Sequence, residues 1–186
     1  MGTDIHIAVE IFRDGAWHLS DAEVTEDRNY RAFAVLADVR NGYGFGGFST
    51  GEALEPIDEP RGLPGDLSAE LRRAAPNSSS DDYSNHIWLG DHSFSWVTLR
   101  ELLDYDLDKP VIVRGYVSKE AAQRYRETGE TPRSYAAAVF ANLENFERLE
   151  WPEPIRESAW LIPRLIEELT PLGEPEHVRI VFGFDS

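Results

Sequence analysis

The sequence predicts an α+β protein with a mainly antiparallel sheet, which includes both terminal strands, and with helices packed on one face. Three observations support this fold class. Residues at both ends of the chain alternate between apolar and polar side chains, helical patterns lie between these ends, and no strand–helix unit repeats. With 186 residues, of which 41% are hydrophobic, the chain suits a single globular domain spanning residues 1–186.

The first part of the chain predicts a hairpin followed by a helix. Residues 4–12 (DIHIAVEIF) alternate with period two, which is typical of a half-buried strand. Asp14-Gly15 favours a tight turn, so residues 16–19 (AWHL) are expected to form the returning strand. Asp27 is the expected N-cap of a helix that ends at Asn41-Gly42.

The middle of the chain predicts loops between short elements. Residues 41–65 are rich in glycine and proline and also carry aromatic residues, so they form either a loop that covers a ligand or a segment pinned to the core by its rings. Residues 67–75 predict a short helix, and residues 86–99 predict a short strand with a turn. Thr98 and Glu101 have the spacing of a capping box, which predicts the start of another helix.

The last part of the chain predicts three helices between two strands. The run VIVRGYV at residues 111–117 predicts a strand, and residues 119–128 predict a charged helix. Apolar residues spaced by three and four predict a helix over residues 134–149, and a further helix is expected over residues 157–169. The segment HVRIVFGFDS alternates again and predicts a terminal strand.

Composition narrows the classes of partner. The formal net charge of -16 disfavours nonspecific binding to nucleic acid, because acidic surfaces repel phosphates. The chain has no cysteine, which excludes disulfides and thiolate metal sites and fits a reducing cytoplasm. We expect a cytoplasmic protein, because no secretion signal and no membrane-spanning apolar run is visible.

Two pairs of ionisable residues form the candidate metal site. Asp4 and His6 lie two positions apart on a predicted strand, so their side chains share one face about 7 Å apart. Asp91 and His92 supply a second carboxylate and imidazole. These groups are ligands of Zn, Mn and Fe, and a bound divalent metal could activate water against a phosphodiester. The alternative is that the four groups hydrogen-bond to one another and to the backbone.

A second set of residues suits a small anionic ligand. Guanidinium groups pair with phosphate and carboxylate, and aromatic rings stack on bases. The candidates are Tyr43, Trp96, Arg114 and Arg179, with Arg28, Arg40 and Arg61 as further arginines in or beside predicted elements. The alternatives are salt-bridged surface arginines and aromatic rings that belong to the core. A hydroxyl nucleophile beside His92, at Ser93 or Ser95, has no nucleophile elbow around it.

Several sequence blocks together resemble a known family. The blocks are DIHIAVE, DRNYRAFAVLADVRNG, EPRGLP, HSFSWVTLRELLDYD and VRIVFGFD, and they occur in this order over nearly the whole chain. They are similar to those of a family of small, uncharacterised bacteriophage and prophage proteins, many of which read HSHS where this chain has HSFS. The resemblance implies a phage origin and expression in a bacterial cytoplasm. It implies no activity.

These observations lead to two hypotheses of function. The first is a phage accessory protein that binds, and in one version hydrolyses as a metal-dependent phosphoesterase, a nucleotide-like or other small anionic ligand of host defence signalling. The second is a noncatalytic acidic protein, or DNA mimic, that binds a host protein. Many acidic residues lie at helical spacing from arginines, as in ERLE and RELLD, which favours the first hypothesis over mimicry. A homo-oligomer is compatible with both.

Overall fold

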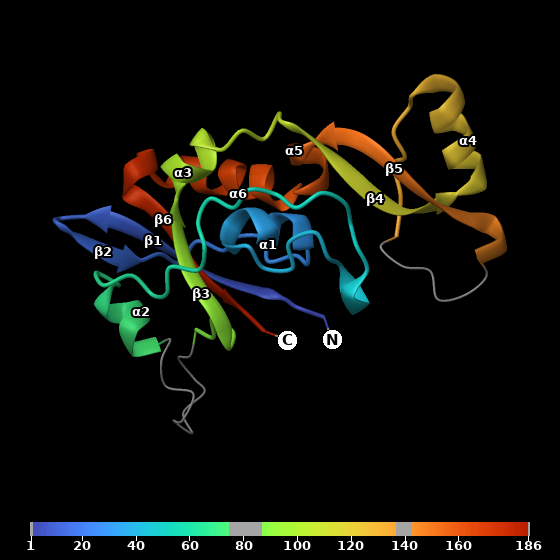
Figure 1. Ribbon diagram of the computed structural model, residues 1–186. Coiled ribbons are helices and arrows are strands. Elements are labelled where there is room, and N and C mark those ends of the chain that lie inside the picture. Colours follow the sequence, from blue (N-terminus) through green and yellow to red (C-terminus); the bar gives the residue numbers. More distant parts are fainter. Residues whose placement is uncertain (1, 75–86, 137–142, 186) are drawn as a thin grey trace.

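The computed structural model describes residues 2–74, 87–136 and 143–185 (Figure 1). Its main sheet is antiparallel and has the strand order β2-β1-β6-β3. The strands are β1 (Ile5–Arg13), β2 (Ala16–Leu19), β3 (His92–Thr98) and β6 (Val178–Phe184). A second antiparallel sheet contains β4 (Pro110–Ser118) and β5 (Phe146–Pro154). The predicted α+β class is therefore confirmed, with both terminal strands paired in one sheet.

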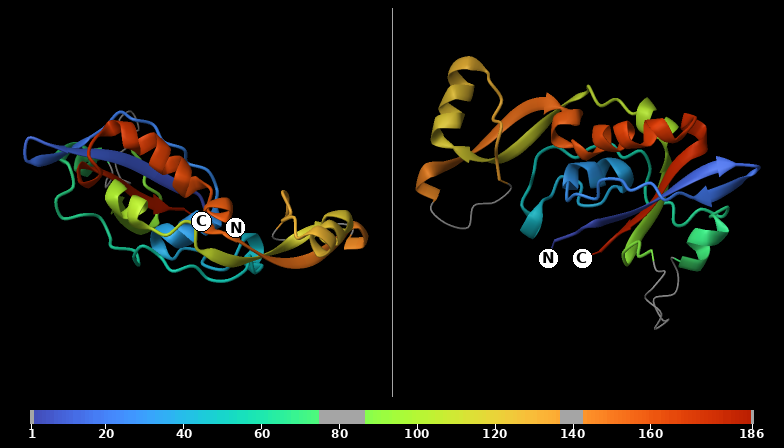
Figure 2. Two further views of the ribbon diagram at one scale, coloured as in Figure 1. Left: turned by 90° about the horizontal axis from the view of Figure 1, so that it is seen from above. Right: turned by 180° about the vertical axis from the view of Figure 1, so that it is seen from behind.

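Six α-helices accompany the two sheets in the described part of the chain. They are α1 (Tyr30–Ala37), α2 (Ala69–Ala74), α3 (Leu99–Asp104), α4 (Lys119–Thr128), α5 (Ile155–Ser158) and α6 (Leu161–Leu169). Helices α1, α3 and α6 cover one face of the main sheet, and the short α2 lies on the opposite face (Figures 1 and 2). We call the main sheet with α1, α2, α3, α5 and α6 the body, and β4, β5 and α4 the arm. No helix of the described residues is long and apolar enough to span a bilayer.

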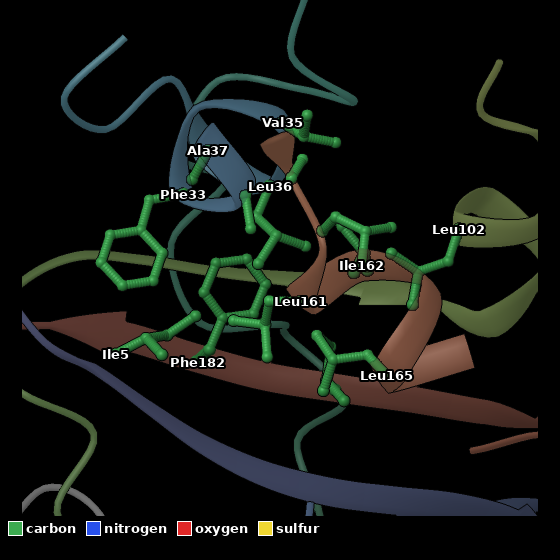
Figure 3. Close-up of a cluster of buried hydrophobic side chains, with 14 of the residues drawn as sticks. Ile5, Phe33, Val35, Leu36, Ala37, Leu102, Leu161, Ile162, Leu165 and Phe182 are labelled. Carbon is green, nitrogen blue, oxygen red and sulfur yellow. The ribbon is translucent and has the colours of Figure 1, made fainter. Parts of the chain in front are cut away.

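The main core lies between the sheet and the three helices (Figure 3). Phe33 and Leu36 of α1 and Leu165 of α6 are fully buried there, against Phe182 of the central strand. Burying one large apolar side chain stabilises a fold by about 1.5–3 kcal/mol, so this cluster fixes α1 and α6 on the sheet. A second, smaller cluster under α2 includes Leu71.

Strand β6 is buried on both faces because it lies in the middle of the main sheet. Phe182 and Phe184 face the main core, whereas Val181 faces the cluster under α2. The alternation predicted from the sequence is confirmed in this strand. Arg179 belongs to the α2 face, and it is also fully buried.

Turn and cap signals of the sequence correspond to local structure. Asp14 and Gly15 have φ values of 54° and 80° and close a two-residue hairpin loop, as type I′ turns require. The Thr98 side chain accepts a hydrogen bond from the Glu101 amide, and the Glu101 side chain accepts one from the Thr98 amide. Burial raises the pKa of Glu101, but hydrogen bonds from Arg61 and Thr98 outweigh it and hold the pKa below its usual value.

The predicted helix over residues 134–149 is wrong where the structure describes the chain. Residues 137–142 lie outside the described residues, and β5 begins at Phe146. From there inward-facing residues alternate with Glu150 and Pro152, which is strand periodicity. Pro152 has no amide hydrogen, and β5 tolerates it because this strand has only one neighbour, β4.

Two other helix boundaries differ from the sequence prediction. The N-cap of α1 is Asn29 and not Asp27, because the Asn29 side chain accepts from the Ala32 amide at 2.7 Å. Asn29 also donates to the carbonyl of Ser158 at 3.0 Å, which links α1 to α5. The predicted helix over residues 157–169 is divided into α5 and α6, and Pro163 lies in the first turn of α6.

The arm joins the body along β4. The Arg114 amide donates to the Thr50 carbonyl and the Glu52 amide donates to the Ile112 carbonyl, so residues 50–52 run beside β4 as a short extra strand. Trp151 and Ala122 anchor a small apolar cluster between the two-stranded sheet and α4. Figure 2 shows the arm extending from the start of α5 away from the main sheet.

Candidate functional site

The start of β1, the end of β6 and the start of β3 lie together at one end of the main sheet. In the antiparallel pairing, His6 lies opposite Gly183, and His92 lies opposite Phe184. The Asp4 amide donates to a carboxylate oxygen of Asp185 at 3.0 Å, which ties the two chain ends together. The sheet therefore brings the two predicted pairs of ionisable residues to the same end of the strands, as a shared site requires.

Around His6, the side chains at this end of the sheet form an ordered polar network. His6 Nε2 lies 3.3 Å from an oxygen of Asp185, and the imidazole ring lies 4.4 Å from the ring of Trp88. Asp4 accepts two hydrogen bonds from the Arg28 guanidinium, at 2.8 and 2.7 Å. These hydrogen bonds hold the pKa of Asp4 below its usual value. Asp4 is therefore committed to an ion pair.

The His92 side chain projects from the opposite face of the sheet. Gly183 and Phe184 are consecutive residues, so the residues paired with them point to opposite faces. The His92 ring accordingly stacks on Phe184 of the main core, with a centroid distance of 6.1 Å. The two imidazoles are separated by the sheet itself.

The four predicted metal ligands do not converge. Asp4 pairs with Arg28, His6 contacts Asp185, and His92 lies across the sheet from both. Asp91 is exposed and donates its backbone amide to the Phe184 carbonyl at 2.8 Å. Over residues 2–74, 87–136 and 143–185, no group of three or more histidine, aspartate or glutamate side chains is arranged to hold a metal ion.

The predicted ligand-binding residues also fall into separate places. Arg114 lies on the arm, where it pairs with Glu150 and donates to the Ser49 hydroxyl at 2.9 Å. Tyr43, which is exposed, bridges to the same Ser49 through the backbone. Arg179 lies on the main sheet, so one ligand site does not unite it with Arg114.

Arg179 is part of the protein interior. It is 1% exposed and forms an ion pair with Glu10 at 2.7 Å and one with Asp66 at 2.8 Å. The guanidinium lies 3.9 Å from the ring centre of Trp17 and 5.6 Å from that of Trp96. We therefore assign Arg179 and Trp96 to the packing of the α2 face. Glu10, on the polar face of the first strand, is its fully buried ion-pair partner.

A hollow of about 490 Å³ opens beside His92, between the end of α1 and the start of β3. We call it the His92 pocket. Its polar lining residues are Thr3, Asp38, Arg40, Glu59, His92 and Ser93. Arg40 Nε donates to the Thr3 hydroxyl at 2.9 Å, and its guanidinium lies 5.5 Å from the ring centre of Tyr30. The pocket therefore combines a guanidinium, an imidazole, two hydroxyls and two carboxylates.

The backbone around the His92 pocket is strained. Four described residues other than glycine have positive φ: Asp14, Asp38, Arg40 and Ser93. Asp14 lies in a hairpin turn and Asp38 caps a helix, where aspartate tolerates this conformation. Arg40 (φ 57°) lies in a turn after α1, and Ser93 (φ 52°) lies where the pairing of β3 with β6 shifts; arginine and serine adopt this conformation less readily than aspartate, and both line the pocket. Strain of about 1–3 kcal/mol per residue concentrates at functional sites.

A bulge in β3 gives Ser93 its position. The pairing with β6 shifts between His92 and Ser95, so an extra residue is inserted there. In a regular strand adjacent side chains point to opposite faces, but here His92 Nδ1 lies 3.0 Å from Ser93 Oγ. The bulge thus places a hydroxyl and an imidazole side by side at the pocket wall.

Sequence reasoning identified parts of this pocket without joining them. His92 was predicted as a metal ligand, Arg40 as one of several candidate arginines, and Ser93 as a hydroxyl near His92. Thr3 and Glu59 carried no signal in the sequence. The bulge itself has no reliable sequence signature, although Gly90 (φ 85°) precedes it closely.

Comparison of the chain with models of protein families, with curated proteins and with solved structures gives no match.

Proposed function

We propose that the protein binds a small anionic ligand of the nucleotide or phosphate-ester class in the His92 pocket. The observation that carries this proposal is the clustering of strain: among the described residues, the two with left-handed backbone that are neither glycine nor aspartate, Arg40 and Ser93, both line one hollow. A strained conformation persists only where the surrounding structure enforces it, and such sites are often organised for a ligand.

The lining residues suit the parts of a nucleotide. The Arg40 guanidinium supplies charge-assisted hydrogen bonds for phosphate oxygens. The Ser93 hydroxyl and the His92 imidazole add two further donors. The carboxylates of Asp38 and Glu59 repel a highly charged ligand but accept hydrogen bonds from sugar hydroxyls. A nucleoside monophosphate fits this combination better than a triphosphate.

The proposal concerns binding, and hydrolysis is its extension. A hydroxyl 3.0 Å from an imidazole is within the distance for proton transfer. A water or hydroxyl attack on a bound phosphate ester would need that transfer. No step through a metal ion is required by this arrangement.

The biological role follows from the family resemblance. Phage accessory proteins act inside a bacterial host, and one that binds a nucleotide would sequester a signal of host defence. The acidic net charge of -16 is compatible with this role, because the ligand would be held by local groups rather than by a basic surface.

The test is a calorimetric titration of the intact chain with adenosine, guanosine, cytidine and uridine monophosphates and with inorganic phosphate. We expect at least one monophosphate to bind with a stoichiometry of one per chain, and His92→Gln and Arg40→Lys to weaken it. Arg100→Lys is the matched control, because Arg100 is half exposed and pairs with Glu176 on the surface. Equal weakening in the control, or no binding by any of these probes, would contradict the proposal.

Failure of this test would favour the second hypothesis, a noncatalytic acidic protein that binds a host protein. A hollow of about 530 Å³ supports that alternative, since four carboxylates (Glu55, Glu101, Asp104 and Asp106) and a single lysine (Lys109) line it. Basic side chains of a partner would then bind there, and salt would weaken the complex.

A further inference from the structure

Arg31 of α1 is a buried arginine at the junction of the body and the arm. Its side chain is 5% exposed, and its Nη1 donates to the Glu52 carbonyl at 2.6 Å. Glu52 itself is bonded through its amide to Ile112 of β4. Glu153 of β5 and Tyr135 lie close enough to interact electrostatically with the guanidinium. The arginine therefore faces the arm from the body.

Most of the hydrogen-bonding capacity of Arg31 is unused. Within the described residues, both Nε and Nη2 are buried and have no hydrogen-bond partner. A buried polar atom without a partner loses its bonds to water and gains nothing in exchange. The Thr50 hydroxyl, on the same segment as Glu52, is also buried without a partner. Two neighbouring elements thus present unpaired donors at one junction.

The neighbouring Glu153 side chain does not supply the hydrogen bonds that Arg31 lacks. Glu153 is 9% exposed, and one of its oxygens accepts a hydrogen bond from Trp151 Nε1 at 2.7 Å. In the part of the chain that the structure describes, Arg31 and Glu153 form no ion pair. Burial raises the pKa of Glu153 and lowers the pKa of Arg31, so each group lacks the pairing that would offset its desolvation.

We propose that the Nε–Nη2 edge of Arg31 binds the carboxylate of a small ligand between α1 and the arm. These two atoms form the side-on fork of the guanidinium, whose two parallel donors match the two oxygens of a carboxylate. The Thr50 hydroxyl, buried two residues before the Glu52 carbonyl that Arg31 contacts, is a further unpaired donor at this junction. This site is separate from the His92 pocket and does not depend on the function proposed there.

The surroundings favour a carboxylate over a phosphate. One negative charge balances the single positive charge of Arg31, whereas a phosphate dianion would leave excess negative charge beside Glu153. The ring of Tyr135, which is exposed, packs on Trp151 at 5.0 Å and is close enough to Arg31 to interact with it electrostatically.

The test uses formate, the smallest carboxylate, and nuclear magnetic resonance of the arginine Nε–H groups in the intact chain. The Arg31 signal is assigned by its loss in Arg31→Lys, and Arg28→Lys is the control for a nearby exposed arginine. We expect formate to shift the Arg31 signal along a saturating curve, with no such shift from chloride at equal ionic strength. Inorganic phosphate is expected to bind at least about tenfold more weakly.

Three results decide the matter. A formate response that does not saturate, or that equals the chloride response, overturns the proposal and leaves water as the occupant. Equal binding of phosphate overturns the choice of a carboxylate.

If Arg31→Lys does not fold, Glu153→Gln is used in its place. This variant removes a repelling charge and is expected to bind formate more tightly. Weaker binding of formate by this variant contradicts the proposal. His92→Gln leaves the formate response unchanged, which separates this site from the nucleotide pocket.

Discussion

Replacing Ser93 by glycine tests whether the backbone of the His92 pocket is strained. Ser93 has a φ of 52°, and a residue with a Cβ atom pays roughly 1–2 kcal/mol for the left-handed region. Glycine avoids this cost but loses about 0.5–1 kcal/mol more conformational entropy on folding than alanine does. The difference leaves Ser93→Gly more stable than Ser93→Ala by roughly 0.5–1 kcal/mol. Alanine is the proper reference, because both variants lose the contact from Ser93 Oγ to His92.

The assay is equilibrium unfolding in urea, monitored by tryptophan fluorescence and by circular dichroism. Ser95 is the matched control, since it lies two residues further along the same strand and has no positive φ. There the order reverses, and glycine is less stable than alanine by about 0.5–1 kcal/mol. If glycine is also the less stable variant at position 93, the strain is absent in solution and the main argument for the pocket fails.

Three further predictions concern stability. Arg179→Met lowers the free energy of unfolding in urea by about 3–5 kcal/mol, because it leaves Glu10 buried without its partner. A second change, Glu10→Leu, restores most of this loss. A double variant that recovers no stability would contradict a buried ion pair. Asn29→Ala lowers stability by about 0.5–2 kcal/mol through the lost cap of α1, whereas Asp27→Ala has little effect; the reverse order would restore the cap expected from the sequence. The lowered pKa of Glu101 gives a contribution that is complete above its unfolded value of 4.5 and is lost as the pH falls through the lower folded value. Glu101→Gln is therefore less stable at neutral pH and shows a shallower loss in acid, and parallel pH profiles would refute this.

The sequence predicts the terminal strands better than the strands of the arm. Apolar residues occupy every second position of both terminal strands, and in β6 these positions face the main core. Strand β5 is different, because the run before Trp151 also matches a helical spacing of three and four. Only its pairing with β4 decides between the two patterns, and a single segment does not reveal a partner 36 residues away at Arg114–Glu150.

The candidate site was only partly predictable for a related reason. Asp4 and His6 lie at the same end of the sheet as His92, but β3 does not lie beside the first strand, because β6 separates them. The face that each side chain occupies depends on the strand order and on a bulge. Local periodicity predicts neither of them. The left-handed backbone of Arg40 and Ser93 results from tertiary packing that overrides local preference.

The central claim is that a nucleotide-like ligand binds in the His92 pocket. The most direct measurement is a titration of isotope-labelled protein with the monophosphate that binds most tightly, followed by nuclear magnetic resonance of the backbone amides. The account predicts saturable shifts at residues 38–40 and at His92 and Ser93, and little change around Arg179. Saturable shifts that occur elsewhere and spare the pocket would contradict it.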